Sequence, residues 1–299
     1  MEKTLQVQSV LYNADIARLR QVFIHLERAV QLAISGGYYA AINLSLGDCS
    51  PARQISDDEL RELKSYVPTV ESVSYTYFDN NIGSAGGHNV LLNGILTDYV
   101  LIVNPDVMLA PDCLIQLTKP YLKDESVGMV EARQLPIEHP KDYNTLTGET
   151  DWAATACALI DAYLATSLDG FDSSAFFLYC DDVDFSWRVR LAGRKVLFQP
   201  AAVAFHDKRL SPSGEWMPSN AEQYYSAEAA LILAHKYSRQ DIVHELLKVF
   251  TESDENILNR AADEYRARDA VNKLPKPIDS DHKVGRFYNG FYAKHRYQL

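Results

Sequence analysis

Five consecutive apolar residues, Tyr99 to Val103, constrain the fold of this chain more than any other stretch. They show no alternation of apolar and polar side chains, which indicates a strand that is buried on both faces. Such strands are typical of parallel sheets, in which helices cover both sides. We therefore expect an α/β domain built on a mostly parallel sheet.

The part of the chain before this strand alternates between two apolar periodicities. Apolar residues in alternation or in short runs predict three earlier strands, and spacings of three and four residues predict helices between them. The expected strands lie at 5–11, 38–46 and 70–78, and the expected helices at 16–34, at 57–66 and after the glycine-rich stretch 80–89. This order is typical of a doubly wound sheet, whose ligands bind at the carboxyl ends of the strands.

The second half of the chain has a less regular pattern. The elements expected there are helices at 111–121, 185–191, 221–238 and 240–268, strands at 127–132, within 151–160 and at 196–198, and a break at Pro200. With 299 residues, the chain is long enough for one large domain and an appendage. We divide it into a domain at 1–215, with halves at 1–107 and 108–215, and a helical region at 216–299.

The composition excludes several classes of protein. The formal net charge of −11 argues against a general nucleic-acid-binding surface, which would be basic. The four cysteines are far apart and form no CxxC pair, which favours buried thiols of a cytosolic protein over a zinc site. No stretch approaches ~20 continuous apolar residues and the N-terminus has no signal region, so neither a membrane span nor a secretory leader is predicted.

Three acids, Asp181, Asp182 and Asp184, follow an apolar and aromatic stretch in the second half of the chain. Carboxylates this close together cannot easily all be ionised without a cation, and acids in apolar surroundings commonly bind a metal or transfer protons. Asp184 and Arg188 are four residues apart on the predicted helix, which is the spacing of an ordinary ion pair. This leaves Asp182, and next Asp181, as the candidate general base.

Other chemically capable residues follow the predicted strands. Asp106 comes just after the buried strand, where a carboxylate suits either a hard divalent cation that also holds a diphosphate or the cap of the next helix. His206 is either a further ligand of that cation or a structural histidine. The glycines of the stretch 80–89 allow either close approach of a ligand or close packing of a helix, and they form neither a Walker loop nor a GxGxxG motif.

Together these motifs resemble one family. Tyr12 and Asn13 follow the first strand, Asp48 follows the second, and then come, in order, NIGSAGGHN, NPDV and GFDSSAFFLYCDDVDFSWRVRLAGRKVLFQPAAVAFH. Over residues 5–210 the order is similar to that of family 2 glycosyltransferases of the inverting GT-A type, in particular the bacterial rhamnosyltransferase-like branch. The resemblance implies a GT-A fold, with a Rossmann-like, mostly parallel central sheet flanked by helices and, here, a helical C-terminal appendage.

The resemblance also implies that 1–215 is the catalytic domain, with a nucleotide-binding half at 1–107 and an acceptor and catalytic half at 108–215, and it implies roles for individual residues. Asp182 matches the general base of the family, and Asp181 stands beside it in place of the commoner Glu. Asp106 and His206 match metal ligands, for Mg²⁺ or Mn²⁺, whereas Asn104 stands where many relatives have an acid and leaves metal dependence open. The residues that match donor-binding positions are Tyr12, Asn13, Asp48 (at the nucleobase), Asn81, Gly83, Gly87, Asn89 and Asn104. The residues that match positions meeting a sugar are Asp151 and Trp152, on the acceptor side.

The implied activity is transfer of a sugar, with inversion, from a nucleotide diphosphate sugar to a saccharide or lipid-linked saccharide in the synthesis of O-antigen or capsule. Rhamnose from dTDP-rhamnose is the first choice of donor, and a UDP-sugar carrying galactofuranose, galactose or glucose is the alternative. Outside this class, the lost acid at Asn104 also allows a catalytically idle nucleotide-sugar-binding protein. A nicotinamide oxidoreductase lacks its glycine signature here.

The tail at 281–299 combines basic and aromatic residues and has two interpretations. It docks on an anionic bilayer, which would place a cytoplasmic protein at the inner face of the plasma membrane near lipid-linked acceptors. Alternatively, it packs on its own domain or on the partner subunit of a homo-oligomer. The aromatic residues do not form one helical stripe, which favours packing.

Overall fold

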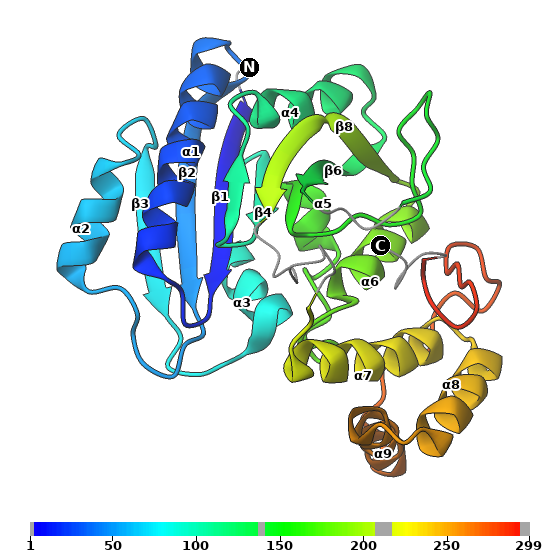
Figure 1. Cartoon of the computed structure of the whole chain (residues 1–299). Coiled ribbons are helices and arrows are strands. Elements are labelled where there is room, and N and C mark those ends of the chain that lie inside the picture. Colours follow the sequence, from blue (N-terminus) through cyan, green and yellow to red (C-terminus); the bar gives the residue numbers. More distant parts are fainter. Residues whose placement is uncertain (1–2, 137–140, 207–216, 294–299) are drawn as a thin grey trace.

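The computed structural model describes residues 3–136, 141–206 and 217–293. Within them, one sheet of eight strands has the order β3-β2-β1-β4-β7-β6-β8-β5 (Figure 1). The strands are β1 (Lys3–Leu11), β2 (Tyr39–Asp48), β3 (Ser72–Tyr77), β4 (Tyr99–Val103), β5 (Val107–Leu109), β6 (Val127–Leu135), β7 (Cys157–Asp161) and β8 (Lys195–His206). Only β5 and β7 are antiparallel to their neighbours among these strands, which confirms the predicted α/β fold with a mostly parallel sheet.

Helices cover both faces of the sheet, as the apolar strand β4 requires. Side chains of β4 alternate between two hydrophobic cores: Leu101 packs in one, and Val100 and Ile102 pack in the other. The helices that contribute to the first core are α1 (Ile16–Ser35), α2 (Asp57–Ser65) and α4 (Cys113–Lys123). Those that contribute to the second are α3 (Gly83–Leu92), α5 (Ala162–Ser167) and α6 (Asp181–Leu191).

The predicted break at Pro200 is wrong, because β8 continues through this proline to His206. The pairing with β6 shows how the strand accommodates it. Ala132 pairs with Gln199, but the next residue, Arg133, pairs with Val203, so the residues between form a bulge. A strand tolerates proline in a bulge, because residues of the bulge do not donate a hydrogen bond to the neighbouring strand and proline has no N–H to donate.

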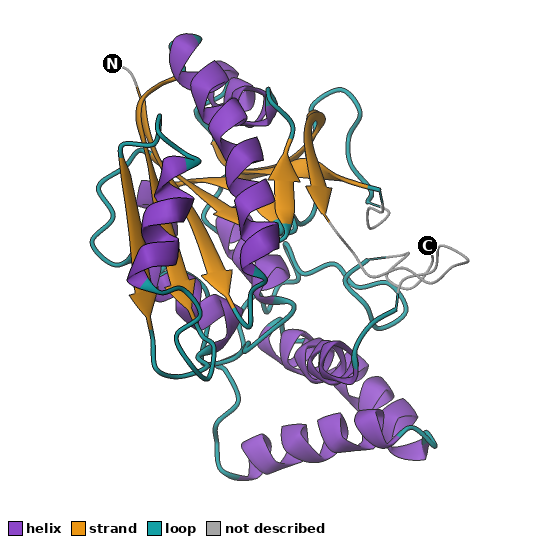
Figure 2. Cartoon of the chain, turned by 60° about the vertical axis from the view of Figure 1, so that its left-hand side comes forward, coloured by secondary structure: helices purple, strands orange, loops and turns teal. Residues whose placement is uncertain are grey.

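Three further helices, α7 (Asn220–Lys236), α8 (Gln240–Glu252) and α9 (Asn256–Ala270), lie together to one side of the sheet (Figure 2). The single helix predicted over 240–268 is therefore two helices, and this prediction is wrong. Between them the hydroxyl of Ser253 accepts a hydrogen bond from the N–H of Glu255, a local turn that competes with helix. The predicted boundary at 215/216 falls outside the described residues.

The C-terminal region packs against α6. Trp187 of α6 meets Tyr237, just after α7, with ring centroids 4.6 Å apart, and also Phe287 of the tail at 5.2 Å. Tyr292 of the tail meets Trp152 at 4.9 Å. These aromatic residues of the tail therefore pack on their own chain, and residues 294–299 lie outside the described part. No described helix combines the length and apolar content that crossing a membrane would need.

Candidate active site

The carboxyl ends of β1, β2 and β3 lie at one edge of the sheet, where the nucleotide-binding residues were predicted. Leu11 of β1 is in register with Asp48 of β2, which places Tyr12 and Asn13 beside the loop after β2. The N–H of Asn13 donates to the hydroxyl of Ser50 in that loop, at 2.8 Å. Tyr12 is half exposed, so a ligand at this edge can reach its ring.

Asp48 is fully buried, and its carboxylate is engaged by the protein. It accepts hydrogen bonds from the N–H of Ser50 at 2.9 Å, from the N–H of Gln54 at 3.0 Å and from the hydroxyl of Tyr75. Burial alone would raise the pKa of Asp48, but these hydrogen bonds outweigh it and leave the pKa below its usual value. Asp48 thus shapes the loop after β2, and its direct contact with a nucleobase stays a prediction.

The glycines that begin α3 have packing partners. At Gly83 the backbone has φ of +75°, and a Cβ would lie 2.4 Å from the carbonyl oxygen of Phe177. At Gly87 a Cβ would lie 2.8 Å from the side chain of Val10 on β1. Close packing of α3 therefore accounts for both glycines, and a donor contact stays a prediction.

Two asparagines flank these glycines. The Oδ1 atom of Asn81 accepts a hydrogen bond from the N–H of Gly83 at 3.1 Å, a local turn that leads into α3. The side chain of Asn89 donates to the carbonyl of Phe171 at 2.7 Å and accepts from its N–H at 2.8 Å. Asn89 thus fixes the segment that leads to the three acids, a role that the sequence did not reveal.

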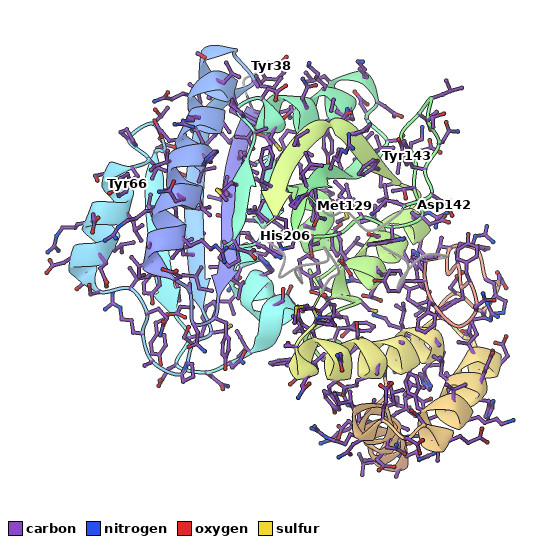
Figure 3. The ribbon with its side chains drawn as sticks, viewed as in Figure 1. Tyr38, Tyr66, Met129, Asp142, Tyr143 and His206 are labelled. Carbon is purple, nitrogen blue, oxygen red and sulfur yellow. The ribbon has the colours of Figure 1, made fainter. Side chains whose placement is uncertain are left out.

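Asp106 and His206 are brought together by the pairing of β5 with β8. Val107 is in register with His206, and the Nε2 atom of His206 lies 3.6 Å from Oδ1 of Asp106 (Figure 3 marks His206 near the middle of the molecule). The Nδ1 atom of the ring is 2.8 Å from Oε1 of the buried Gln134. A neutral ring that donates from Nδ1 to this oxygen presents an unprotonated Nε2 toward Asp106, as a metal ligand requires.

These residues fit a divalent cation that is held largely by its substrate. One carboxylate and one imidazole leave room for phosphate oxygens and water, and Mg²⁺ sites commonly combine few carboxylates with substrate phosphates and water. Within the described residues, no group of three or more His, Cys, Asp and Glu side chains could hold a metal. Asn104 forms the turn before Asp106: its N–H donates to Ala156 and its carbonyl accepts from Val107.

The acid pair occupies the first turn of α6. Tyr179 and Cys180 both have left-handed backbone conformations, with φ of 67° and 56°, which turn the chain sharply into the helix. Such conformations cost free energy in non-glycine residues and tend to occur at functional sites. Asp181 is buried, whereas Asp182 is half-buried. Burial, and then the charge of Asp182, raise the pKa of Asp181 to about 8.

Asp184 has the predicted structural role. Its carboxylate accepts from the guanidinium of Arg188 at 2.8 Å, and it also pairs with Lys236 of α7 at 2.7 Å. Lys236 continues to Asp172 in the segment before α6, and the hydroxyl of Tyr237 lies 3.2 Å from Asp184. The pair with Arg188 follows from sequence spacing, but the contacts with α7 join residues too distant in the chain for any local pattern to show.

A second buried ion pair joins β6 to the segment before Trp152. Glu131 of β6 and Lys141 form a salt bridge in which the side chains are only 1% and 2% exposed. The Nζ atom of Lys141 also donates to the carbonyl of Trp152 at 3.0 Å and lies 3.6 Å from the centroid of its ring. Burial raises the pKa of Glu131, and the nearby charge of Asp182 adds to the rise. The pair joins residues ten apart in the chain, and the local signal for it is a Glu within the apolar strand β6.

Trp152 and Asp151 are adjacent in sequence but face different surroundings. Trp152 is buried between Lys141 and Tyr292. Asp151 pairs with Arg190 at 3.0 Å and lines a separate open groove of about 690 Å³. Arg190 is eight residues beyond Asp182 on α6, or about 12 Å along the helix axis. Figure 3 accordingly shows two other lining residues, Asp142 and Tyr143, toward the edge of the molecule and away from His206.

Strand β6 joins the two halves of the candidate site. Glu131 interacts electrostatically with Asp182, and Gln134, three residues later, holds His206. Three residues span about 10 Å along a strand. One short stretch of β6 therefore contributes to the surroundings of both pairs.

Comparison of the structure with solved proteins identifies the class of this fold. The mannosyltransferase PcManGT from Pyrobaculum calidifontis, in complex with GDP-Man and Mn²⁺, superposes with a TM-score of 0.59 at 15% identity, covering 92% of this chain and 82% of that one. GalNAc-T7 with UDP, GalNAc and Mn²⁺ superposes with a TM-score of 0.63 at 13% identity, covering 95% of this chain and 57% of that one. The fold is that of the GT-A glycosyltransferases, as predicted.

Sequence comparison gives a narrower likeness. Rhamnosyltransferase WbbL from Escherichia coli K12 is 26% identical over 139 residues, which cover 36% of this chain and 52% of that protein. This chain therefore spans about half the length of the curated relative it matches. No protein-family model matches the sequence.

Proposed function

We propose that this protein is an inverting glycosyltransferase of the hexosyltransferase class. Such an enzyme moves a sugar from a nucleotide diphosphate sugar to a hydroxyl of a saccharide acceptor. The observation that carries the proposal is that a GT-A fold brings Asp106 and His206 together and places Asp181 and Asp182 in the first turn of α6. One pair suits proton transfer, and the other suits a cation bound to a diphosphate.

The residues of the chain have distinct roles in this reaction. Asp182, which follows the buried Asp181 in the first turn of α6, accepts the proton of the acceptor hydroxyl as that oxygen attacks the anomeric carbon. Asp106 and His206 would hold Mg²⁺ or Mn²⁺, which when bound stabilises the charge that develops on the departing nucleoside diphosphate. Tyr12, Asn13 and the loop held by Asp48 form the edge at which the nucleoside binds.

The choice of donor rests on the relatives. Similarity to WbbL favours rhamnose from dTDP-rhamnose, and hence a role in the synthesis of a cell-surface polysaccharide on a saccharide or lipid-linked acceptor in the cytoplasm. The solved neighbours hold GDP-Man or UDP, which keeps UDP-sugars such as UDP-galactofuranose, UDP-galactose and UDP-glucose as the alternative. An idle binding protein is disfavoured because Asp106, Asp182 and His206 are all retained.

A donor screen tests the proposal. The purified chain is incubated with dTDP-rhamnose, the three UDP-sugars and GDP-mannose, with Mn²⁺ or with EDTA, and released nucleotide and melting temperature are both measured. We expect one donor to raise the melting temperature and to release nucleotide slowly by hydrolysis, more so with Mn²⁺. A donor that binds but is never hydrolysed or transferred would favour the idle binding protein. No response to any nucleotide would contradict the proposal.

A further inference from the structure

We propose that Lys141 is a positioning residue that balances the buried charge of Glu131 beside Asp182 and fixes the segment 141–154 next to the acid pair. This inference rests on the proposed role of Asp182 as the base. It concerns a residue that touches neither the donor nor the reacting oxygen. Lys141 acts through Glu131 and Trp152, and its effect is electrostatic as well as geometric.

The contacts of Lys141 show why it can act this way. Its ammonium is enclosed on three sides, by the carboxylate of Glu131, the carbonyl of Trp152 and the face of the Trp152 ring. A desolvated ammonium over an indole face is strongly attracted to it. The three contacts therefore tie β6 to the segment that contains Trp152, and the backbone of Ala154 also hydrogen-bonds Glu131.

A structural role alone would not require charges at this place. Removing two ions from water costs free energy that their mutual attraction often only offsets, and apolar residues of similar volume are commonly as stabilising. The segment that Lys141 holds also reaches Asp182 through Ser186, whose hydroxyl accepts from the N–H of Ala153 at 3.0 Å and donates to the carbonyl of Asp182 at 2.7 Å. Glu131 and Asp182 also interact electrostatically. An unbalanced anion here would disfavour the ionised form of the base, and an unbalanced cation would favour it too strongly for efficient proton transfer.

The other charged groups around Asp182 are arranged in balanced sets. On its own helix, Asp181 is protonated near neutral pH, and Asp184 is paired with Arg188. Lys236 of α7 pairs with both Asp184 and Asp172. From β6 and the segment after it come Glu131 and Lys141, and the Cys157 thiol near Glu131 has a pKa raised well above its usual value and is neutral. Substituting one member of the Glu131–Lys141 pair therefore changes the local charge in a known direction.

The test reads the carboxyl of Asp182 directly. Protein labelled with ¹³C at the aspartate carboxyl is titrated by NMR, and the Asp182 signal is assigned as the one missing from Asp182→Asn. Glu131→Gln leaves Lys141 unbalanced, so we expect the pKa of Asp182 to fall by about half a unit or more. Adding Lys141→Gln removes that charge, and we expect the pKa to return toward the wild-type value.

Two controls make the result specific. Lys3→Met breaks the pair of Lys3 with Asp98, which lies at the amino ends of β1 and β4, and should leave the Asp182 titration unchanged. If the Gln–Gln variant does not fold, Lys141→Met with Glu131→Gln provides a second neutral pair. An unchanged pKa in Glu131→Gln, or an equal pKa in the single and double variants, would overturn the inference. Since the titration needs no donor, failure of the proposed activity would appear separately in the donor screen.

Discussion

The Nδ1 atom of His206 lies 2.8 Å from the side-chain oxygen of Gln134, while its Nε2 atom lies 3.6 Å from Oδ1 of Asp106. Gln134 is buried on β6, so it has few alternatives to this partner. The amide therefore fixes both the tautomer and the orientation of the imidazole. Partners of this kind commonly matter to a metal site nearly as much as the ligands themselves.

Gln134→Leu should therefore weaken metal binding without removing a ligand. We expect the affinity for Mn²⁺, measured by calorimetry with the preferred nucleotide present, to fall about 10- to 100-fold. Gln116→Leu, on α4, is the matched control and should bind Mn²⁺ as the wild type does. Equal affinities in Gln134→Leu and the control would show that this amide does not orient a ligand.

The raised pKa of Asp181 predicts how stability depends on pH. The folded-state pKa of about 8 exceeds the value in the unfolded chain, so folding is favoured when Asp181 is protonated and this contribution is lost as the pH rises toward 8. Asp181→Asn removes this pH-dependent contribution to stability, because an amide does not titrate. Relative to the wild type, its free energy of unfolding in urea should rise with pH between 5 and 8, by on the order of 1 kcal/mol per pH unit. A difference that does not change with pH would contradict the shift.

Lys236 should be more important to stability than its place in the C-terminal region suggests. It is 6% exposed and joins Asp184 of α6 to Asp172. Lys236→Met removes a buried cation that both carboxylates share. We expect this change to lower the free energy of unfolding by about 3–5 kcal/mol. Arg266→Ala breaks an exposed pair with Asp263 and should cost about 1 kcal/mol or less. Similar losses in the two variants would show that the Lys236 bridge is weak.

The sequence was most informative where a pattern is local. The uninterrupted apolar residues of β4 predicted a mostly parallel sheet and the first and last residues of this strand. The spacing of Asp184 and Arg188 predicted their ion pair. The sequence was least informative where the end of a strand depends on the strand that pairs with it. Pro200 ends an isolated strand, but pairing with β6 accommodates it in a bulge.

The residues of the candidate site also differ in how far the sequence could predict them. The segment containing Asp181 and Asp182 was recognisable because its motif is contiguous. The residues that set its electrostatics, Glu131, Lys141 and Lys236, come from elements far apart in the chain and meet it only after folding. Gly87 shows the converse, since its close approach to Val10 on β1 is a packing requirement that a sequence motif cannot distinguish from a ligand contact.

The central claim is that Asp182 is the general base, and paired substitutions test it most directly. With the donor found in the screen, turnover is measured for Asp182→Asn and for Asp181→Asn, and donor affinity is measured in parallel. We predict that Asp182→Asn binds donor normally but loses about 10²–10⁴-fold in turnover. Asp181→Asn, whose amide replaces a carboxyl that is protonated near neutral pH, should keep most of its turnover. Wild-type turnover in Asp182→Asn would contradict the account.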